Sequence, residues 1–342
     1  MGNERPKFSF PERAHFMRKI LGLGVAPLPF LIVAWPILLA LVAGWPQGLR
    51  AAEEKEKAKG KVEAEESKAP PEPEVITLTT DDGVDLKATY YYPSTKKGME
   101  KTIPIIMVHG TKGDRRDFED LATYLQGLGH AVIVPDLRGQ GANTHFTLRP
   151  DDYSLIVSAD MEAVKRFLKE QNNEKKLNID ALCIVGLGSG AVVALNYSQI
   201  DWAYPPLAIG KQGQDVKALV LISPDLSVKG LSARDALADM NVRANLSILL
   251  IYGEKNSKAV RDAKLVYGAF ERYHPTPSAE EAADKQDLFK VTQETALQGA
   301  KLLNENNFKA NLNGFIAKFI DLRLVKKPTP WSVRKNPLDR DK

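Results

Sequence analysis

The 342-residue sequence contains a single cysteine, Cys183. One cysteine excludes an intrachain disulfide, and no group of cysteines and histidines has the spacing of a zinc site. Cys183 lies inside an apolar run that is typical of a strand, which predicts a small buried side chain. The sequence therefore predicts neither a metal site nor a bound cofactor.

The part of the chain between its two basic ends lacks the clustered basic residues of a nucleic-acid surface. The formal net charge is +4, but lysine and arginine concentrate in the first nineteen residues and in the segment from Arg323 onward. Between these ends, no basic run is interleaved with aromatic residues, which is the pattern expected of a nucleic-acid surface. With 44% apolar residues the chain can bury a substantial core, and nucleic acid is not an expected partner.

The first long feature that the sequence does contain is an uncharged apolar run at residues 20–45. At helical rise this run is long enough to cross a bilayer, and residues 1–19 before it form a basic N-terminal segment. The pattern predicts a retained signal anchor, with the membrane as a partner and the following domain outside the cytoplasm. A long signal peptide, cleaved near residues 42–44 to release a secreted protein, is the alternative that the pattern leaves open.

Two charged segments flank the part of the chain that is expected to fold. Residues 46–74 are rich in Glu, Lys and Pro and have almost no apolar side chain to bury, which predicts a solvated linker. Residues 325–342 have a similar composition and are predicted to form a basic disordered tail. A single domain is therefore expected at residues 75–324.

Short apolar runs alternate with helical patterns within residues 75–324. Apolar and polar residues alternate on both sides of Asp82-Gly83, which predicts a β-hairpin. Five apolar runs follow, each typical of a buried parallel strand: IPIIMVHG, AVIVPDLRG, ALCIVGLG, KALVLISP and SILLIYGE. Stretches of helical period separate these runs. The alternation predicts an α/β fold, with a mostly parallel central sheet and helices on both faces.

The motifs of these runs resemble those of the α/β-hydrolase superfamily, which includes esterases, lysophospholipases and serine peptidases. Residues 108–141, from VHGTKG to DLRGQG, look like the oxyanion loop, first helix and DxRGxG turn of that family. VGLGSGAVVAL at residues 185–195 occupies the place of its G-x-S-x-G nucleophile elbow. ILLIYGEKN and TALQGAKLL stand where the family has its acid and its histidine. The resemblance implies an α/β-hydrolase fold over residues 75–324.

The same glycine-rich turn also fits a dinucleotide-binding fingerprint, because Gly186, Gly188 and Ala191 match G-x-G-x-x-A. Such a site needs an acidic residue about twenty positions further on, at the end of the next strand. Asp201 has nearly that spacing but does not follow an apolar strand. The fingerprint also belongs at the start of its fold, so the nucleophile elbow is the favoured interpretation.

The elbow lacks its nucleophile. The resemblance places the nucleophile, acid and base of a catalytic triad at three positions that are occupied here by Gly188, Asn256 and Gln298. Glutamine has no basic pKa near neutral pH, and asparagine cannot stabilise an imidazolium as a carboxylate does. The resemblance also implies that the N–H groups of Thr111 and Ser189 form the oxyanion hole, with the Ser189 side chain directed along its helix.

These substitutions favour a degenerate serine hydrolase that acts as a binding or scaffold domain, with an unidentified small-molecule or protein ligand in its cleft. The alternative is an active esterase- or peptidase-type hydrolase that uses displaced residues such as Ser189 and Asp225. His109 is a further candidate for acid–base chemistry. No histidine follows the last predicted strand, where the family's base must lie. Whether the chain is an enzyme stays open at this point.

Overall fold

A computed structural model describes residues 70–94, 98, 101–144, 147–205, 207–208, 210–277 and 285–335. The predicted N-terminal segment and apolar run, and most of the predicted linker, lie outside the described residues. All the described residues belong to one structural unit, which begins at Ser67. Among them, no helix is both long enough and apolar enough to cross a bilayer.

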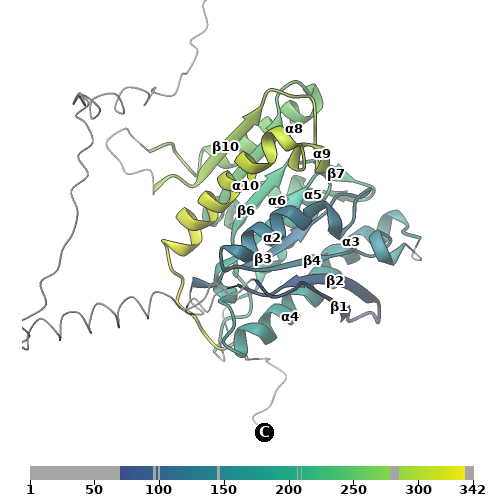
Figure 1. Cartoon of the computed structure of the whole chain (residues 1–342), viewed down its shortest axis with the longest axis vertical. Coiled ribbons are helices and arrows are strands. Elements are labelled where there is room, and N and C mark those ends of the chain that lie inside the picture. The colour runs from purple at the N-terminus through teal and green to yellow at the C-terminus, as the bar shows by residue number, and fades with distance from the viewer. Residues whose placement is uncertain are drawn as a thin grey trace, which may run out of the picture. The chain divides into compact units, whose positions relative to one another are not determined.

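A central sheet organises the domain, and in the described part of the chain it has eight strands in the order β1-β2-β4-β3-β5-β6-β9-β10 (Figure 1). Strand β2 is antiparallel to both of its neighbours, and every pair from β4 to β10 is parallel. The bounds are β1 Glu74–Thr79, β2 Asp85–Tyr91, β3 Pro104–Val108, β4 Ala131–Pro135, β5 Leu182–Leu187, β6 Val216–Ile222, β9 Ser247–Gly253 and β10 Leu288–Gln293. Strands β7 (Ser227–Val228) and β8 (Leu231–Ser232) form a separate short ribbon. The hairpin at Asp82-Gly83 and the mostly parallel sheet are confirmed.

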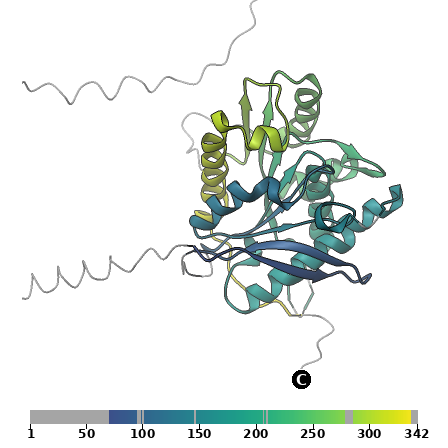
Figure 2. The ribbon, with the colours of Figure 1, turned by 45° about the vertical axis from the view of Figure 1, so that its right-hand side comes forward.

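Helices cover both faces of this sheet, as Figures 1 and 2 show. Helices α4, α5 and α8 pack into one core and α2, α9 and α10 into the other. The bounds are α2 Glu119–Gly127, α3 Tyr153–Leu155, α4 Met161–Asn173, α5 Gly190–Ala203, α6 Arg234–Ala238, α7 Met240–Asn245, α8 Ser257–Glu271, α9 Ala300–Leu303 and α10 Asn306–Ile320. Short 3₁₀ and π turns are η2 Arg115–Phe118, η3 Gly141–Asn143, η4 Pro150–Asp152, η5 Ile156–Asp160, η6 Ile179–Ala181 and η8 Asp321–Val325.

Strand β5 shows why the central strands are unbroken apolar runs in the sequence. Leu182 and Ile184 point into the core beneath α5, whereas Cys183 and Val185 point into the core beneath α10. Because both faces are covered, all six residues of the strand are buried. Cys183 is buried as expected, and burial raises the pKa of its thiol.

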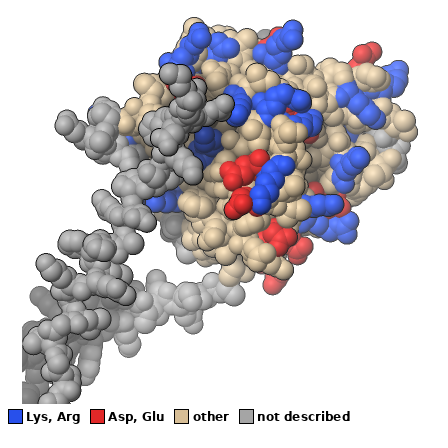
Figure 3. All heavy atoms as spheres, turned by 90° about the horizontal axis from the view of Figure 1, so that it is seen from above, with Lys and Arg blue, Asp and Glu red and all other residues tan. Residues whose placement is uncertain are grey.

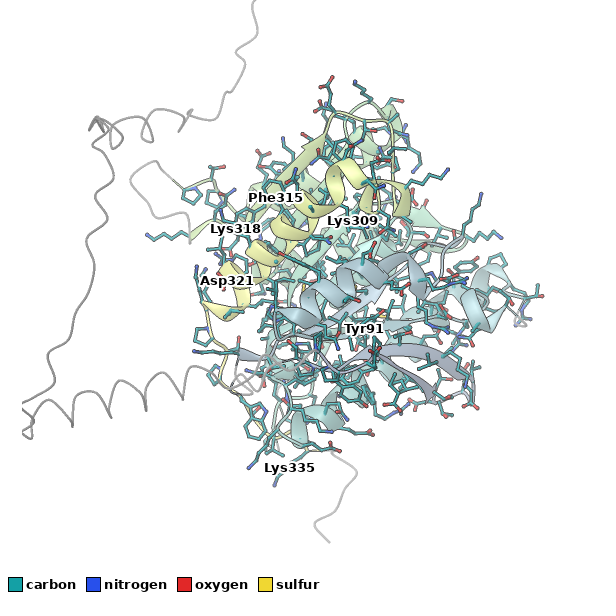
Figure 4. All side chains as sticks on the ribbon, viewed as in Figure 1. Tyr91, Lys309, Phe315, Lys318, Asp321 and Lys335 are labelled. Carbon is teal, nitrogen blue, oxygen red and sulfur yellow. The ribbon has the colours of Figure 1, made fainter. Side chains whose placement is uncertain are left out.

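The C-terminal segment, residues 326–335, lies against the domain. The side-chain amide of Asn172, near the end of α4, donates a hydrogen bond to the carbonyl oxygen of Ser332 at 2.9 Å. Figure 4 shows Lys335 at the far end of this segment, below the sheet. Residues of the segment predicted to be a tail therefore have partners on the domain, which composition alone does not reveal.

Among residues 326–335, Arg334 is the one that is buried in the domain. Its side chain is 3% exposed, and its Nη2 lies 2.8 Å from Asp180 and also bonds Asp215. Lys165, which is fully buried, bonds Asp215 at 2.9 Å and also bonds Asp201. Burial raises the pKa of the Asp215 carboxyl, but the surrounding cations outweigh it and lower that pKa. These five residues form a buried charge cluster at the amino ends of β5 and β6.

Candidate functional site

The turn between β5 and α5 has the geometry of a nucleophile elbow. Gly188 has φ +58°, in the left-handed region that glycine adopts without steric cost. A Cβ on Gly190 would overlap the carbonyl oxygen of Val108, and one on Gly186 would lie 2.6 Å from the Cα of Ala191. The flanking glycines are therefore required by the close approach of helix, turn and neighbouring strand, which is the reason for their spacing.

The structure brings together the three positions that the resemblance assigned to a triad. Gly188 follows β5, Asn256 follows β9 and Gln298 follows β10. All three line one cavity of about 340 Å³, and Asp225 lines it with them. Because the carboxyl ends of parallel strands meet at one edge of a sheet, these turns converge although they are far apart in the sequence.

The side chains of Asn256 and Gln298 are bonded to the nearby backbone. The Asn256 side-chain oxygen accepts a hydrogen bond from the N–H of Ala259 at 3.0 Å, so it caps the N-terminus of α8. Gln298 Nε2 donates to the carbonyl oxygen of Gly253 at 3.1 Å. Its Oε1 is buried and has no hydrogen-bond partner among the described residues. Both side chains therefore hold turns in place at this edge of the sheet.

Ser189 is oriented differently from the prediction. Its Oγ accepts a hydrogen bond from the N–H of Thr111 at 2.8 Å, and the residue is 7% exposed. The expectation that this side chain runs along the helix is wrong, because the first turn of α5 directs it toward the loop after β3. Both residues line a cavity of about 400 Å³ together with Gly188. The hydroxyl oxygen thus occupies the position in which the N–H of Thr111 would hold a ligand oxygen.

Asp225 faces the space above the elbow. Its Oδ2 lies 3.6 Å from the position that a Cβ on Gly188 would take, and its Oδ1 forms an ion pair with Lys258. The Lys258 ammonium also bonds Asp262 at 2.8 Å. Burial lowers the pKa of Lys258, but the two carboxylates outweigh it and raise that pKa. Asp225 therefore forms its ion pair through Oδ1, while its Oδ2 lies beside the centre of the elbow.

The described histidines do not supply a base to this cleft. His109 is buried, and its Nδ1 lies 2.9 Å from the carbonyl oxygen of Gly110. The Nε2 of His274 lies 2.6 Å from a backbone carbonyl oxygen. No histidine of the described residues lines the cavities around the elbow. His15 and His145 lie outside the described part of the chain.

Ser223 is a cleft residue that the sequence analysis missed. It follows β6 directly and has φ +48°, which is uncommon for a residue other than glycine. Its hydroxyl accepts a hydrogen bond from the N–H of Gly299 at 2.9 Å, and it lines the same cavity as Gln298. Its place at the carboxyl end of a predicted parallel strand is the signal that could have identified it. Within the described residues, no group of three His, Cys, Asp or Glu side chains is arranged to hold a metal ion.

Residues 105–323 match the model of the Alpha/beta hydrolase family. This match spans more than half of the chain and agrees with the sheet order and with the geometry of the elbow. The chain therefore belongs to the α/β-hydrolase family.

Solved structures of esterases share the fold. An esterase of Pyrococcus furiosus is 15% identical, with a TM-score of 0.52 over 73% of this chain and 92% of that chain. EstE1, a thermophilic carboxylesterase cloned from a metagenomic library, is 15% identical, with a TM-score of 0.53 over 83% of this chain and all of that chain. An esterase of Pyrobaculum calidifontis is 15% identical, with a TM-score of 0.53 over 80% of this chain and 92% of that chain. At such low identity, the likeness shows the fold alone.

Curated relatives match a smaller part of the chain. An uncharacterized protein of Mycobacterium tuberculosis, found in strains H37Rv and CDC 1551, is 32% identical over 120 residues. The match covers 35% of this chain and 39% of the relative, so the chain spans well under half the length of the curated relatives it matches.

Proposed function

We propose that the chain is a degenerate serine hydrolase that binds a ligand in its cleft, as a binding or scaffold domain, without hydrolysing it. The observation that supports this proposal is the convergence of Gly188, Asn256 and Gln298 on one cavity. A triad needs a nucleophile, a base with a pKa near the working pH, and a carboxylate that orients the base. The three residues supply none of these groups.

The bonding of the oxyanion loop also supports this proposal. An oxyanion hole stabilises charge that develops on a substrate oxygen, and it must offer free N–H groups at that position. Here the Thr111 N–H already donates to Ser189 Oγ. A substrate oxygen would have to displace Ser189 Oγ before this N–H could stabilise charge on it, so this donor is not available to an oxyanion in the arrangement seen here.

The alternative is a hydrolase that uses Ser189 as a displaced nucleophile with Asp225 as an assisting carboxylate. It has support from one observation, since both residues line the same two cavities. In the described part of the chain, however, no hydrogen bond leads from the Ser189 hydroxyl to a proton acceptor. A serine without such an acceptor stays a weak nucleophile.

Labelling with a fluorophosphonate probe separates the two functions. We expect no labelling of the full-length protein and no hydrolysis of activated esters, and Ser189→Ala should behave identically. The variant that combines Gly188→Ser, Asn256→Asp and Gln298→His is the one expected to acquire labelling, because it restores nucleophile, carboxylate and base. Wild-type labelling that disappears in Ser189→Ala would refute the non-catalytic proposal and establish the displaced nucleophile.

For the N-terminal region, we propose that residues 20–45 anchor the chain in a membrane and that the domain is extracytoplasmic. The length and lack of charge of this run support the proposal. Secretion after signal cleavage is the alternative. Carbonate extraction of membranes distinguishes them: an anchored chain stays in the pellet, whereas a soluble exported chain that begins near Trp45 would refute the anchor.

The distribution of surface charge bears on the partner. On the face seen in Figure 3, basic side chains are scattered and acidic groups lie among them. Nucleic-acid surfaces instead gather basic side chains into a patch or stripe. The charges on this face therefore give no support to a nucleic-acid partner, and we propose that the partner is a small molecule or protein in the cleft.

A further inference from the structure

We infer that the surface that holds the C-terminal segment is a recognition site for a peptide segment bearing an arginine, and that such a segment of a partner protein displaces residues 329–335 from it. The surface lies at the amino ends of β5 and β6, whereas the elbow lies at the carboxyl end of β5. It is therefore a second site, independent of the function proposed for the cleft. The slot, as we name this surface, consists of Asn172, Asn173, Asn178, Asp180, Lys211 and Asp215.

The slot binds the backbone of the C-terminal segment through asparagine side chains. Asn173 accepts a hydrogen bond from the N–H of Arg334 at 2.8 Å and donates one to the carbonyl oxygen of the same residue at 2.9 Å. Two further asparagines of the slot donate to carbonyl oxygens of the segment at 2.7 and 2.9 Å. Because every peptide offers such backbone groups, these bonds recognise a chain in this conformation whatever its side chains are.

The charges of the slot select an arginine at one position. Arg334 Nη2 lies 2.8 Å from Asp180 and also bonds Asp215, and its Nη1 donates to the carbonyl oxygen of Lys211 at 2.9 Å. A planar guanidinium can bond these three acceptors at once, which a lysine ammonium does not match. Without Arg334, two cations, Lys165 and Lys211, bond the three aspartates of the buried charge cluster. One negative charge is then left for the cation of a ligand.

The contacts of the C-terminal segment are incomplete, which favours its displacement. The indole Nε1 of Trp331 and the Nε of Arg334 are buried and have no acceptor among the described residues. A buried donor without a partner weakens the docking of the group that carries it. The connection to the rest of the domain, residues 326–328, is exposed. The segment is therefore joined to the domain by a connection that few contacts hold in place.

The partner segment must bind better than the segment of this chain. Residues 329–335 are tethered to the slot, so they compete at a high effective concentration. The same segment of a second copy offers identical contacts without that advantage. A phenylalanine in place of Trp331 keeps an aromatic ring and removes one unpaired donor, which stabilises the complex. The occupant is therefore a segment of a different protein, in which an aromatic ring without an N–H precedes the arginine by three residues.

Fluorescence anisotropy of labelled peptides, measured with the full-length protein, tests this displacement. The native peptide has the sequence of residues 328–335, PTPWSVRK. It should bind the protein variant Arg334→Ala at least about tenfold more tightly than the wild type, because the tethered arginine no longer competes. The Trp331→Phe form of the peptide should bind this variant about threefold more tightly than the native peptide. The Arg334→Ala form of the peptide should bind it at least about tenfold more weakly.

A second variant and a matched control accompany this measurement. Arg334→Lys keeps a positive charge in the buried charge cluster and should bind the native peptide at least about threefold more tightly than the wild type, even if Arg334→Ala does not fold. Adding Asn173→Ala to either variant should weaken the peptide about fivefold, because two bonds to its backbone are lost. Asn245→Ala is the control, since its amide also donates to a backbone carbonyl oxygen, that of Asn241, outside the slot. It should leave all affinities unchanged.

Selective ¹⁵N labelling of tryptophan shows displacement directly. The indole resonance of Trp331 in the wild-type protein should shift when the Trp331→Phe peptide is added in excess. Absence of native-peptide binding to the folded Arg334 variants would overturn the inference, and so would equal affinities of the native and Arg334→Ala peptides. An unchanged Trp331 resonance while the peptide is bound would place the peptide elsewhere and also overturn it. A wild-type dimer that Arg334→Ala abolishes would overturn the assignment to a different protein and identify the occupant as a second copy.

Discussion

Replacement of Gly188 by serine tests whether the elbow has the backbone that the structure shows. The residue has φ +58°, a region that costs a side-chain-bearing residue about 1–2 kcal/mol. The added Cβ would meet only Asp225 Oδ2, at 3.6 Å, which is ordinary van der Waals contact. The steric term is therefore close to zero, and Gly188→Ser should lower the free energy of unfolding by the backbone term alone, about 1–2 kcal/mol.

Gly190→Ala is the matched comparison, because it adds a smaller group two residues away. Its Cβ would overlap the carbonyl oxygen of Val108 and lie 2.7 Å from that of His109. Both contacts are with backbone atoms of the neighbouring strand end, which cannot move aside as a side chain can. We expect a loss of about 3 kcal/mol or more, from overpacking rather than from backbone conformation.

Urea unfolding followed by tryptophan fluorescence measures both changes. For a domain of this size, a loss of 1–2 kcal/mol corresponds to a fall in Tm of about 2–8 °C. If Gly188→Ser were as stable as the wild type or more stable, the turn would not hold a left-handed residue. If Gly190→Ala cost no more than Gly188→Ser, the close approach of α5 to β3 would be incorrect.

Two further predictions concern charged groups outside the cleft. Arg334→Ala should destabilise the protein by about 1.5–3 kcal/mol in the same urea assay, because Asp180 and Asp215 lose a charged hydrogen-bond donor but keep Lys211, and Asp215 also keeps Lys165. Lys335→Ala, which removes an exposed neighbour, should change stability by less than about 0.5 kcal/mol, and equal losses would contradict the buried cluster. The hydrogen bond from Arg138 lowers the pKa of Asp82 from 3.8 to about 2, so this carboxylate contributes stability above pH 3.8 that is lost as the pH falls through 2. The difference in stability between wild type and Asp82→Asn should therefore shrink between pH 4 and pH 2, and a constant difference in acid unfolding curves would contradict the ion pair.

Much of the fold could be predicted because its determinants are local in the sequence. The central strands are apolar throughout because both faces are covered, and Asp82-Gly83 provides the backbone freedom of a hairpin turn. The elbow could also be recognised from a short stretch of sequence, because its geometry leaves no room for a Cβ at Gly186 or Gly190. The resemblance then placed Asn256 and Gln298 at the same edge of the sheet, and both residues line the cavity beside Gly188.

Strand β10 shows where local pattern is insufficient. Its sequence LFKVTQ is mixed in polarity, and only Leu288 is buried, because the strand lies at the edge of the sheet. Its register is set by parallel pairing with β9, from Leu288 opposite Ile248 to Gln293 opposite Gly253. A strand of this kind is stabilised by a neighbour distant in the sequence, so its own residues carry a weak signal.

The sequence by itself determined the alternation of strands and helices, the glycine turn, and the residue types Gly, Asn and Gln at positions 188, 256 and 298. Only the tertiary structure decided that Ser189 bonds Thr111 and that Arg334 belongs to the buried charge cluster. Apolar periodicity and backbone freedom depend on a few neighbouring residues, so both can be recognised from the sequence alone. The partner of a polar side chain depends on which groups folding brings within about 3 Å, and those groups are 78 residues apart for Ser189 and 119 for Arg334.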